Sequence, residues 1–219
     1  MTSSPAQRFA VACAELPLVA ILRGVRPDEA IAIGSALVDA GWRMIEVPLN
    51  SPDPLVSIAA LADAFPDVLV GAGTVLGARA VREAHAAGAE LIVAPNFDRD
   101  VVAEAVALEL AALPGVLSAS EAFGALAAGA AGLKVFPAEM VPPPAIKALR
   151  AVLDPATLVL PVGGISLANL AAYRSAGASG FGVGSSLYKP GMPVDEVAAT
   201  ARRWADAWRA ASAPGARPG

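Results

Sequence analysis

The chain has 219 residues, 56% of them hydrophobic and 16% charged, and its mean hydropathy is +0.58. Such a composition can fill a core and excludes a disordered chain. The net charge of −4 argues against a nucleic-acid partner, and apolar runs shorter than the roughly 18 residues of a membrane span argue against a membrane protein.

The first residues lack a basic segment followed by a long apolar run, so we expect no secretory leader, and residues 6–14 predict a short helix. The single cysteine, Cys13, excludes an internal disulfide framework and fits a reducing compartment, which predicts a cytoplasmic protein. No linker interrupts the chain. We therefore expect one domain over 1–219, with its core at about 16–210 and a mobile tail at 211–219.

Four segments in the middle of the chain share one pattern, in which a helix-like stretch ends in Ala-Gly and a short apolar run follows. Glycine at that place suits the left-handed residue that ends a helix, and the apolar run suits a buried parallel strand. The glycines, Gly41, Gly88, Gly129 and Gly177, lie 41 to 48 residues apart. Each interval is long enough for two strand–helix units.

Adding the intermediate units gives eight expected strands, at 17–22, 43–49, 68–74, 90–95, 112–117, 132–136, 158–163 and 180–185. Helical patterns lie between them, for example at 27–40, 77–87 and 166–176, and a last one lies at 194–210. Eight alternating units in a chain of this length predict the α/β class and a compact (β/α)₈ barrel. A doubly wound open sheet is the competing architecture.

Polar residues, glycines and one proline gather where the expected strands end, which is where the active site of such a barrel lies. They are Arg23, Glu46, Asn50, Thr74, Pro95, Asn96, Ser118, Ser120, Glu121, Lys134, Gly163, Gly164, Gly184, Ser185 and Ser186. The last two loops of the set, within 161–166 and 182–188, are glycine-rich, and glycines let backbone N–H groups approach an anion. Two such loops after strands seven and eight favour a phosphate site over glycines that only make tight turns.

Lys134 is the only charged residue between Ala122 and Ala138, so its ammonium group is expected to be costly to bury. One interpretation has the side chain reach the barrel rim and pair with a carboxylate. The other is a nucleophile, because burial can lower the pKa of a lysine until a neutral amine attacks a carbonyl and forms a Schiff base. Only three lysines accompany 13 arginines in this chain, which favours the second interpretation without excluding the first.

Glu46 lies in an apolar run in the same way and also allows two interpretations. It is either a counter-charge for Lys134 or Arg23, or the group that moves protons beside a Schiff-base lysine. Other candidates carry less weight. His85 falls on a helical pattern and is expected to be exposed, no metal site is expected, and Trp204 and Trp208 predict a packing stripe on the last helix.

Seven motifs, in order, resemble those of the bacterial 2-keto-3-deoxy-6-phosphogluconate/galactonate aldolases. They are ILRGV (21–25), IEVPLNSP (45–52), GAGTV (71–75), VAPNF (93–97), GLKVFPAE (132–139), PVGGIS (161–166) and GVGSSLY (182–188). The resemblance runs from about Leu16 to Tyr188. It implies a class I aldolase on a (β/α)₈ barrel, usually a homotrimer, that needs neither a metal nor another cofactor.

The resemblance also implies a role for each matching residue. Lys134 would form the Schiff base and Glu46 would act as general acid and base. Arg23 and Thr74 would bind the carboxylate end of the substrate, and Pro95 and Phe136 would line the pocket. The phosphate would lie on Gly163, Gly164, Gly184 and Ser185.

Two departures from the family pattern concern the substrate. The gluconate branch usually has arginine at the end of the stretch VTLR, whereas the matching stretch here is VPLN, with Pro48 and Asn50, as in the galactonate branch. The second departure is at residues 118–121, which read SASE where the family often has Thr-Pro before the last two residues. The resemblance therefore implies cleavage of 2-dehydro-3-deoxy-6-phosphogalactonate to pyruvate and D-glyceraldehyde 3-phosphate. The alternatives are the gluconate epimer, a phosphosugar isomerase and a non-catalytic phosphate-binding barrel.

Overall fold

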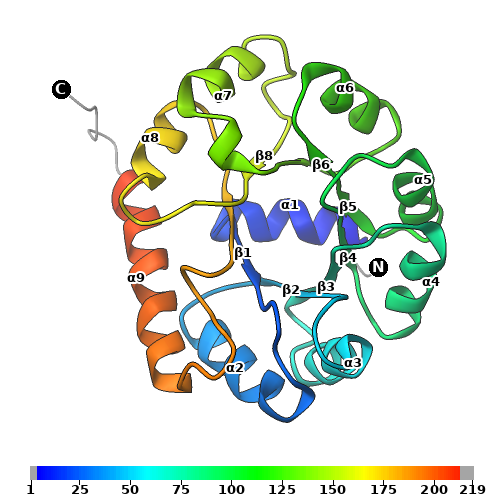
Figure 1. Ribbon diagram of the computed structural model, residues 1–219, viewed down its shortest axis with the longest axis vertical. Coiled ribbons are helices and arrows are strands. Elements are labelled where there is room, and N and C mark those ends of the chain that lie inside the picture. The colour runs from blue at the N-terminus through cyan, green and yellow to red at the C-terminus, as the bar shows by residue number, and fades with distance from the viewer. Residues whose placement is uncertain (1–3, 213–219) are drawn as a thin grey trace.

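The computed structural model describes residues 4–212, in which a ring of helices surrounds a set of short parallel strands (Figure 1). The strands are β1 (Leu18–Ile21), β2 (Met44–Pro48), β3 (Leu69–Gly73), β4 (Leu91–Val93), β5 (Ala111–Leu113), β6 (Gly115–Val116), β7 (Leu133–Val135), β8 (Val159–Pro161) and β9 (Phe181–Val183). The helices are α1 (Pro5–Glu15), α2 (Pro27–Asp39), α3 (Pro54–Ala64), α4 (Ala78–Ala86), α5 (Arg99–Ala107), α6 (Ala119–Ala127), α7 (Pro143–Arg150), α8 (Leu170–Ser175) and α9 (Val194–Ser212). A 3₁₀ turn, η1 (Ala138–Met140), follows β7.

The strands form two parallel sheets, one of six strands in the order β5-β4-β3-β2-β1-β9 and one of three in the order β6-β7-β8. An isolated bridge between Val162 and Gly182 joins the end of β8 to β9. The expected strand at 112–117 is divided into β5 and β6 by Pro114, which has no backbone N–H to donate. The alternation of parallel strands and helices is confirmed, and the larger sheet makes half of a barrel.

Alternate strand residues contribute to two different cores, as the two-residue period of a strand requires. Along β2, Ile45 and Val47 pack with the surrounding helices, whereas Met44 belongs to a second cluster inside the strands. Glu46 therefore shares the inner side with Met44. In β7, Leu133 and Val135 likewise pack outward, so Lys134 between them points inward.

Helix α1 covers one end of this inner core. Phe9, Ala12 and Cys13 of α1 are buried against inner strand residues such as Met44 and Leu69, and α1 crosses behind the strands in Figure 1. The helix begins with a capping box, in which Ser4 accepts a hydrogen bond from the Gln7 N–H and Gln7 accepts one from the Ser4 N–H. The short helix expected at 6–14 is thus confirmed.

The other helices follow the expected pattern with one change. Those expected at 27–40, 77–87 and 194–210 correspond to α2, α4 and α9, but the one expected from 166 begins only at Leu170. The Asn169 side chain is the reason, because it accepts from the Ser166 N–H and donates to the Gly164 carbonyl, which closes a turn ahead of α8. The tail expected to be mobile falls almost wholly outside the described residues. Between residues 4 and 212, no helix is both long and apolar enough to cross a membrane.

Candidate active site

Glu46 and Lys134 are the two ionisable side chains buried deepest inside the strands. Only 1% of Glu46 and 5% of Lys134 is exposed. Each reaches this position because it takes the inward place in an otherwise apolar strand, β2 or β7. Because neither can be well hydrated there, each is a candidate for altered acid–base behaviour.

Burial moves the two pKa values toward each other. It raises the pKa of the Glu46 carboxyl, while the positive charges of Lys134 and Arg23 act in the opposite direction. It lowers the pKa of the Lys134 ammonium, which the negative charge of Glu46 raises and the charge of Arg23 lowers further. The three groups therefore lie close enough to act on one another. In both cases burial is the dominant cause, which favours a neutral amine on Lys134.

Lys134 and Glu46 nevertheless do not form an ion pair. No salt bridge within the described part of the chain includes Lys134, whose Nζ lies 4.8 Å from the centroid of the Phe136 ring. The Glu46 Oε2 atom is buried and has no hydrogen-bond partner among these residues. An unpaired buried acceptor is costly, and a substrate hydroxyl or water could satisfy it.

The loops after β1 and β2 meet at Arg23. Its Nη1 donates to the Asn50 Oδ1 atom over 2.6 Å, and the neighbouring Gly24 N–H donates to the Ser51 hydroxyl over 2.9 Å. The exposed Arg23 head thus lies at the rim, above the buried pair. Thr74, directly after β3, has φ of 58°, a strained conformation for a β-branched residue that persists mainly at functional positions.

The two glycine-rich connections are the β8 loop (162–169) and the β9 loop (184–193). Gly163 and Gly164 have φ values of 99° and 63°, which only glycine adopts without strain. The Ser186 hydroxyl donates to the Ile165 carbonyl over 2.9 Å and so ties the two loops together. The structure therefore brings both glycine-rich loops to one place beside the ends of β8 and β9.

Two residues near these groups carry no role in the sequence reasoning. Gly73 leaves room for Glu46, because a Cβ atom there would lie 2.8 Å from Glu46 Oε1. Glu139 packs on the double glycine, since a Cβ on Gly163 would lie 2.5 Å from its Oε2 atom. Gly73 lies in the motif GAGTV and Glu139 in GLKVFPAE, but the residues that each one contacts depend on the fold.

Other polar residues at strand ends serve the fold. Ser118 and Glu121 form the capping box of α6, in which the Glu121 Oε2 atom accepts from the Ser118 N–H over 2.8 Å. His85 is exposed and Trp204 and Trp208 are buried, as expected. Over residues 4–212, no cluster of three or more His, Cys, Asp or Glu side chains could hold a metal ion.

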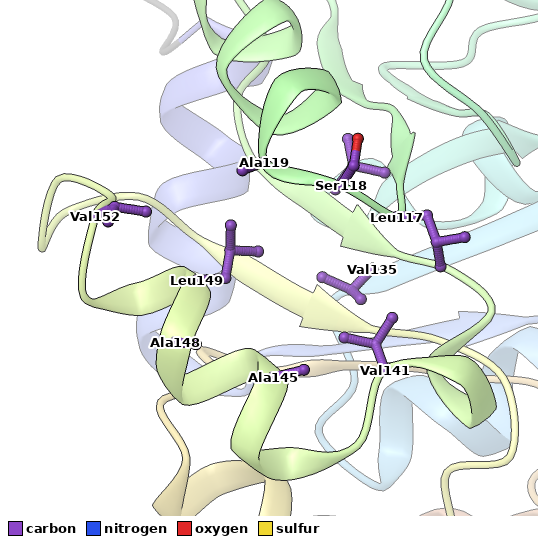
Figure 2. A pocket seen from close by; sticks show the side chains of 10 residues that line it. Leu117, Ser118, Ala119, Val135, Val141, Ala145, Ala148, Leu149 and Val152 are labelled. Carbon is purple, nitrogen blue, oxygen red and sulfur yellow. The ribbon is translucent and has the colours of Figure 1, made fainter.

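A separate apolar groove lies between α6 and α7 and has a volume of about 290 Å³ (Figure 2). We call it the α6–α7 groove. Its lining includes Leu117, Val135, Val141, Ala145, Leu149 and Val152. Because Lys134 points inward while Val135 contributes to this groove, the groove lies on the opposite side of β7 from the buried amine.

Comparisons with known proteins agree with this arrangement. The sequence profile described as "KDPG and KHG aldolase" matches residues 10–201. The 2-dehydro-3-deoxy-6-phosphogalactonate aldolase of Escherichia coli K12 is 46% identical over 198 residues, which cover 90% of this chain and 97% of that protein.

Two solved structures are also similar. One, titled "Native KDPGal structure", has a TM-score of 0.89 and 46% identity, covering 90% of this chain and 97% of the other. The second is a porous protein cage designed by fusing symmetric oligomeric domains, with a TM-score of 0.88 and 45% identity, covering 90% of this chain and 74% of the other. The chain therefore belongs to the KDPG and KHG aldolase family.

Proposed function

We propose that this protein is a Schiff-base aldolase that cleaves 2-dehydro-3-deoxy-6-phosphogalactonate to pyruvate and D-glyceraldehyde 3-phosphate. The observation that carries the proposal is Lys134, a buried lysine whose pKa is lowered by burial and which has no ion-pair partner in residues 4–212. A lysine that only reached the rim would be exposed or paired. The E. coli relative named for this activity supports the choice of substrate.

The reaction begins when the neutral Lys134 amine attacks the C2 keto carbon of the substrate. The resulting carbinolamine loses water, with Glu46 supplying the proton for the leaving hydroxyl, and a protonated imine forms. The raised pKa of Glu46 suits this role, because it makes the carboxylate a stronger proton acceptor after the carboxyl has given its proton.

The protonated imine then acts as an electron sink. Glu46, directly or through a water, removes the proton of the C4 hydroxyl, so that the C3–C4 bond breaks and its electrons pass into an enamine. The aldehyde product, glyceraldehyde 3-phosphate, leaves. Glu46 or its water returns a proton to C3, and hydrolysis of the imine releases pyruvate and restores the Lys134 amine.

The remaining residues hold the two ends of the substrate. Arg23, positioned by Asn50, would bind the carboxylate, and Thr74 would assist it. Backbone N–H groups of the β8 and β9 loops, at Gly163, Gly164, Gly184 and Ser185, would bind the phosphate. Pro95 and Phe136 would line the space between, where the Phe136 ring already lies beside Lys134.

Incubation with pyruvate and borohydride tests the proposal. Reduction of the imine should add one three-carbon group per chain, on Lys134, and Lys134→Met should take up none. A label on Lys147 or Lys189, or no label at all, would leave the isomerase or the phosphate-binding protein as the better interpretation.

We also propose that the chain is one domain in which the two sheets close into a (β/α)₈ barrel, and that it works in the cytoplasm as a homotrimer. The bridge between Val162 and Gly182 supports closure, and the single buried cysteine fits a reducing compartment. A relative that serves as a symmetric oligomeric domain in a designed cage supports self-association. The α6–α7 groove, with Leu117 and Val152 exposed at its edges, is the face that a second copy would cover.

A further inference from the structure

A second cavity, of about 660 Å³, lies between the β8 and β9 loops and α9. We call it the outer cavity. Its lining includes Ser185, Ser186, Lys189, Glu196, Arg203 and Trp204. Glu196 and Arg203 are seven positions apart on α9, so they share one face of that helix.

The lining of the outer cavity has two cations and one carboxylate, so positive charge is in excess there. Lys189 and Arg203 are both exposed, and neither forms an ion pair within residues 4–212. Glu196 is the only carboxylate of the lining. The cavity is thus locally cationic on a protein whose net charge is −4.

The outer cavity adjoins the proposed phosphate site, because Ser185 belongs to both. The Ser186 carbonyl accepts from Trp204 Nε1 over 3.4 Å, and the Ser186 hydroxyl donates to Ile165, so one residue holds α9 and both loops together. The turn that carries Lys189 is closed by a hydrogen bond of 3.0 Å from the Met192 N–H to the Lys189 carbonyl.

We propose that the outer cavity is a capture site for the phosphate group of the incoming substrate, with Lys189 and Arg203 as its specificity-determining cations. The proposal rests on the proposed function. The substrate carries a carboxylate and a phosphate, so a protein of net negative charge repels it as a whole. The residues assigned to phosphate binding are glycines and a serine, which offer neutral donors only. A local pair of cations beside them raises the concentration of phosphate at the loop entrance, and salt screens this effect.

The test compares two double variants that remove the same charge. Lys189→Gln with Arg203→Gln removes the cations of the outer cavity, whereas Lys147→Gln with Arg202→Gln removes an exposed lysine and an exposed arginine outside it. kcat/KM is measured at several ionic strengths with the phosphorylated substrate and with the same sugar acid lacking phosphate.

The cavity variant should lose about threefold to tenfold in kcat/KM for the phosphorylated substrate at low salt, and the loss should fade as salt rises. The control variant and the phosphate-free acid should show no such loss. An equal loss in both variants, an equal loss on both substrates, or no loss would overturn the capture site. Borohydride labelling of Lys134 in the same variants reports on the aldolase proposal separately, because pyruvate carries no phosphate.

Discussion

Lys134 and Glu46 show how burial turns two ordinary side chains into an acid–base pair. Each is costly to keep charged inside the strands, so the pKa of the amine falls and that of the carboxyl rises. Their charges also act on each other, so that Lys134 lowers the pKa of Glu46 and Glu46 raises that of Lys134. The absence of an ion pair between them in the described structure leaves the amine free to attack.

Replacing Glu46 separates its two possible roles. If it moves protons, Glu46→Gln should lower turnover by about 10²- to 10⁴-fold in a folded protein. Glu46 raises the Lys134 pKa, so its removal should also shift the midpoint of pyruvate–borohydride labelling to lower pH, where more of the amine is then neutral. Turnover within tenfold of the parent protein would make Glu46 a counter-charge only.

Asn50 holds the Arg23 guanidinium, and we expect this contact to favour one C4 epimer. Its neutral oxygen fixes the Arg23 guanidinium over 2.6 Å, whereas an arginine at position 50 would repel Arg23 and compete for the carboxylate. We expect a higher kcat/KM for the galactonate epimer, by up to about tenfold. Asn50→Arg should reduce the difference in kcat/KM between the two epimers. kcat/KM is measured as pyruvate release from each epimer. Equal or reversed values in the parent protein would contradict the assignment to the galactonate branch but not the proposal that the protein is an aldolase.

At the scale of elements, several βα connections bring the proposed functional residues to the same side of the molecule. The β1 and β2 loops carry Arg23 and Asn50, β7 carries Lys134, and the β8 and β9 loops carry the glycines. Helix α1 lies at the other end, where it buries Phe9 against the inner strand residues. We therefore expect mutations in α1 to change the free energy of unfolding, and mutations at the opposite end to change activity.

Phe9→Ala tests this separation. Phe9 is 1% exposed, so its truncation should cost about 3 to 5 kcal/mol in the free energy of unfolding, measured with urea. Val11, on the same helix, is 58% exposed, and Val11→Ala should change that free energy by less than about 0.5 kcal/mol. Lys134 labelling under native conditions should remain in both. Equal stability losses would mean that α1 does not seal the inner core.

For the whole molecule, the proposed homotrimer needs a surface that another copy can cover. The α6–α7 groove leaves apolar side chains open to solvent on the outer side of β7, and burying them is the favourable term for association. Lys134 points to the inner side of β7, so assembly through the groove would not cover its side chain.

A charge at the groove edge should weaken the assembly. Val152, at the edge, is 59% exposed, and Ile31, on α2, is 50% exposed and lies outside the groove. Sedimentation of the parent protein should give the mass of three chains. Val152→Asp should shift the mass toward one chain, whereas Ile31→Asp should not. An unchanged mass for Val152→Asp would place the interface elsewhere.

The sequence by itself determined the order of the elements and the identity of the central residues. Short apolar runs, Ala-Gly helix ends and a lone charge in an apolar run are local signals, and they sufficed to predict the order of strands and helices and to single out Glu46 and Lys134. The same signals put polar groups at strand ends without saying which of them serve the fold.

The capping box of Ser118 and Glu121 is a local Ser-x-x-Glu pattern that is already present in the sequence. Only the tertiary structure decided the other contacts, because they join segments far apart in the chain. It paired Asn50 with Arg23, placed Glu139 on the double glycine and gave Glu46 its room beside Gly73. It also divided the strands into two sheets, where Pro114 removes a backbone donor. The shifted pKa values of Lys134 and Glu46 were also decided by the tertiary structure, because burial is a property of the assembled fold and not of the residues in sequence.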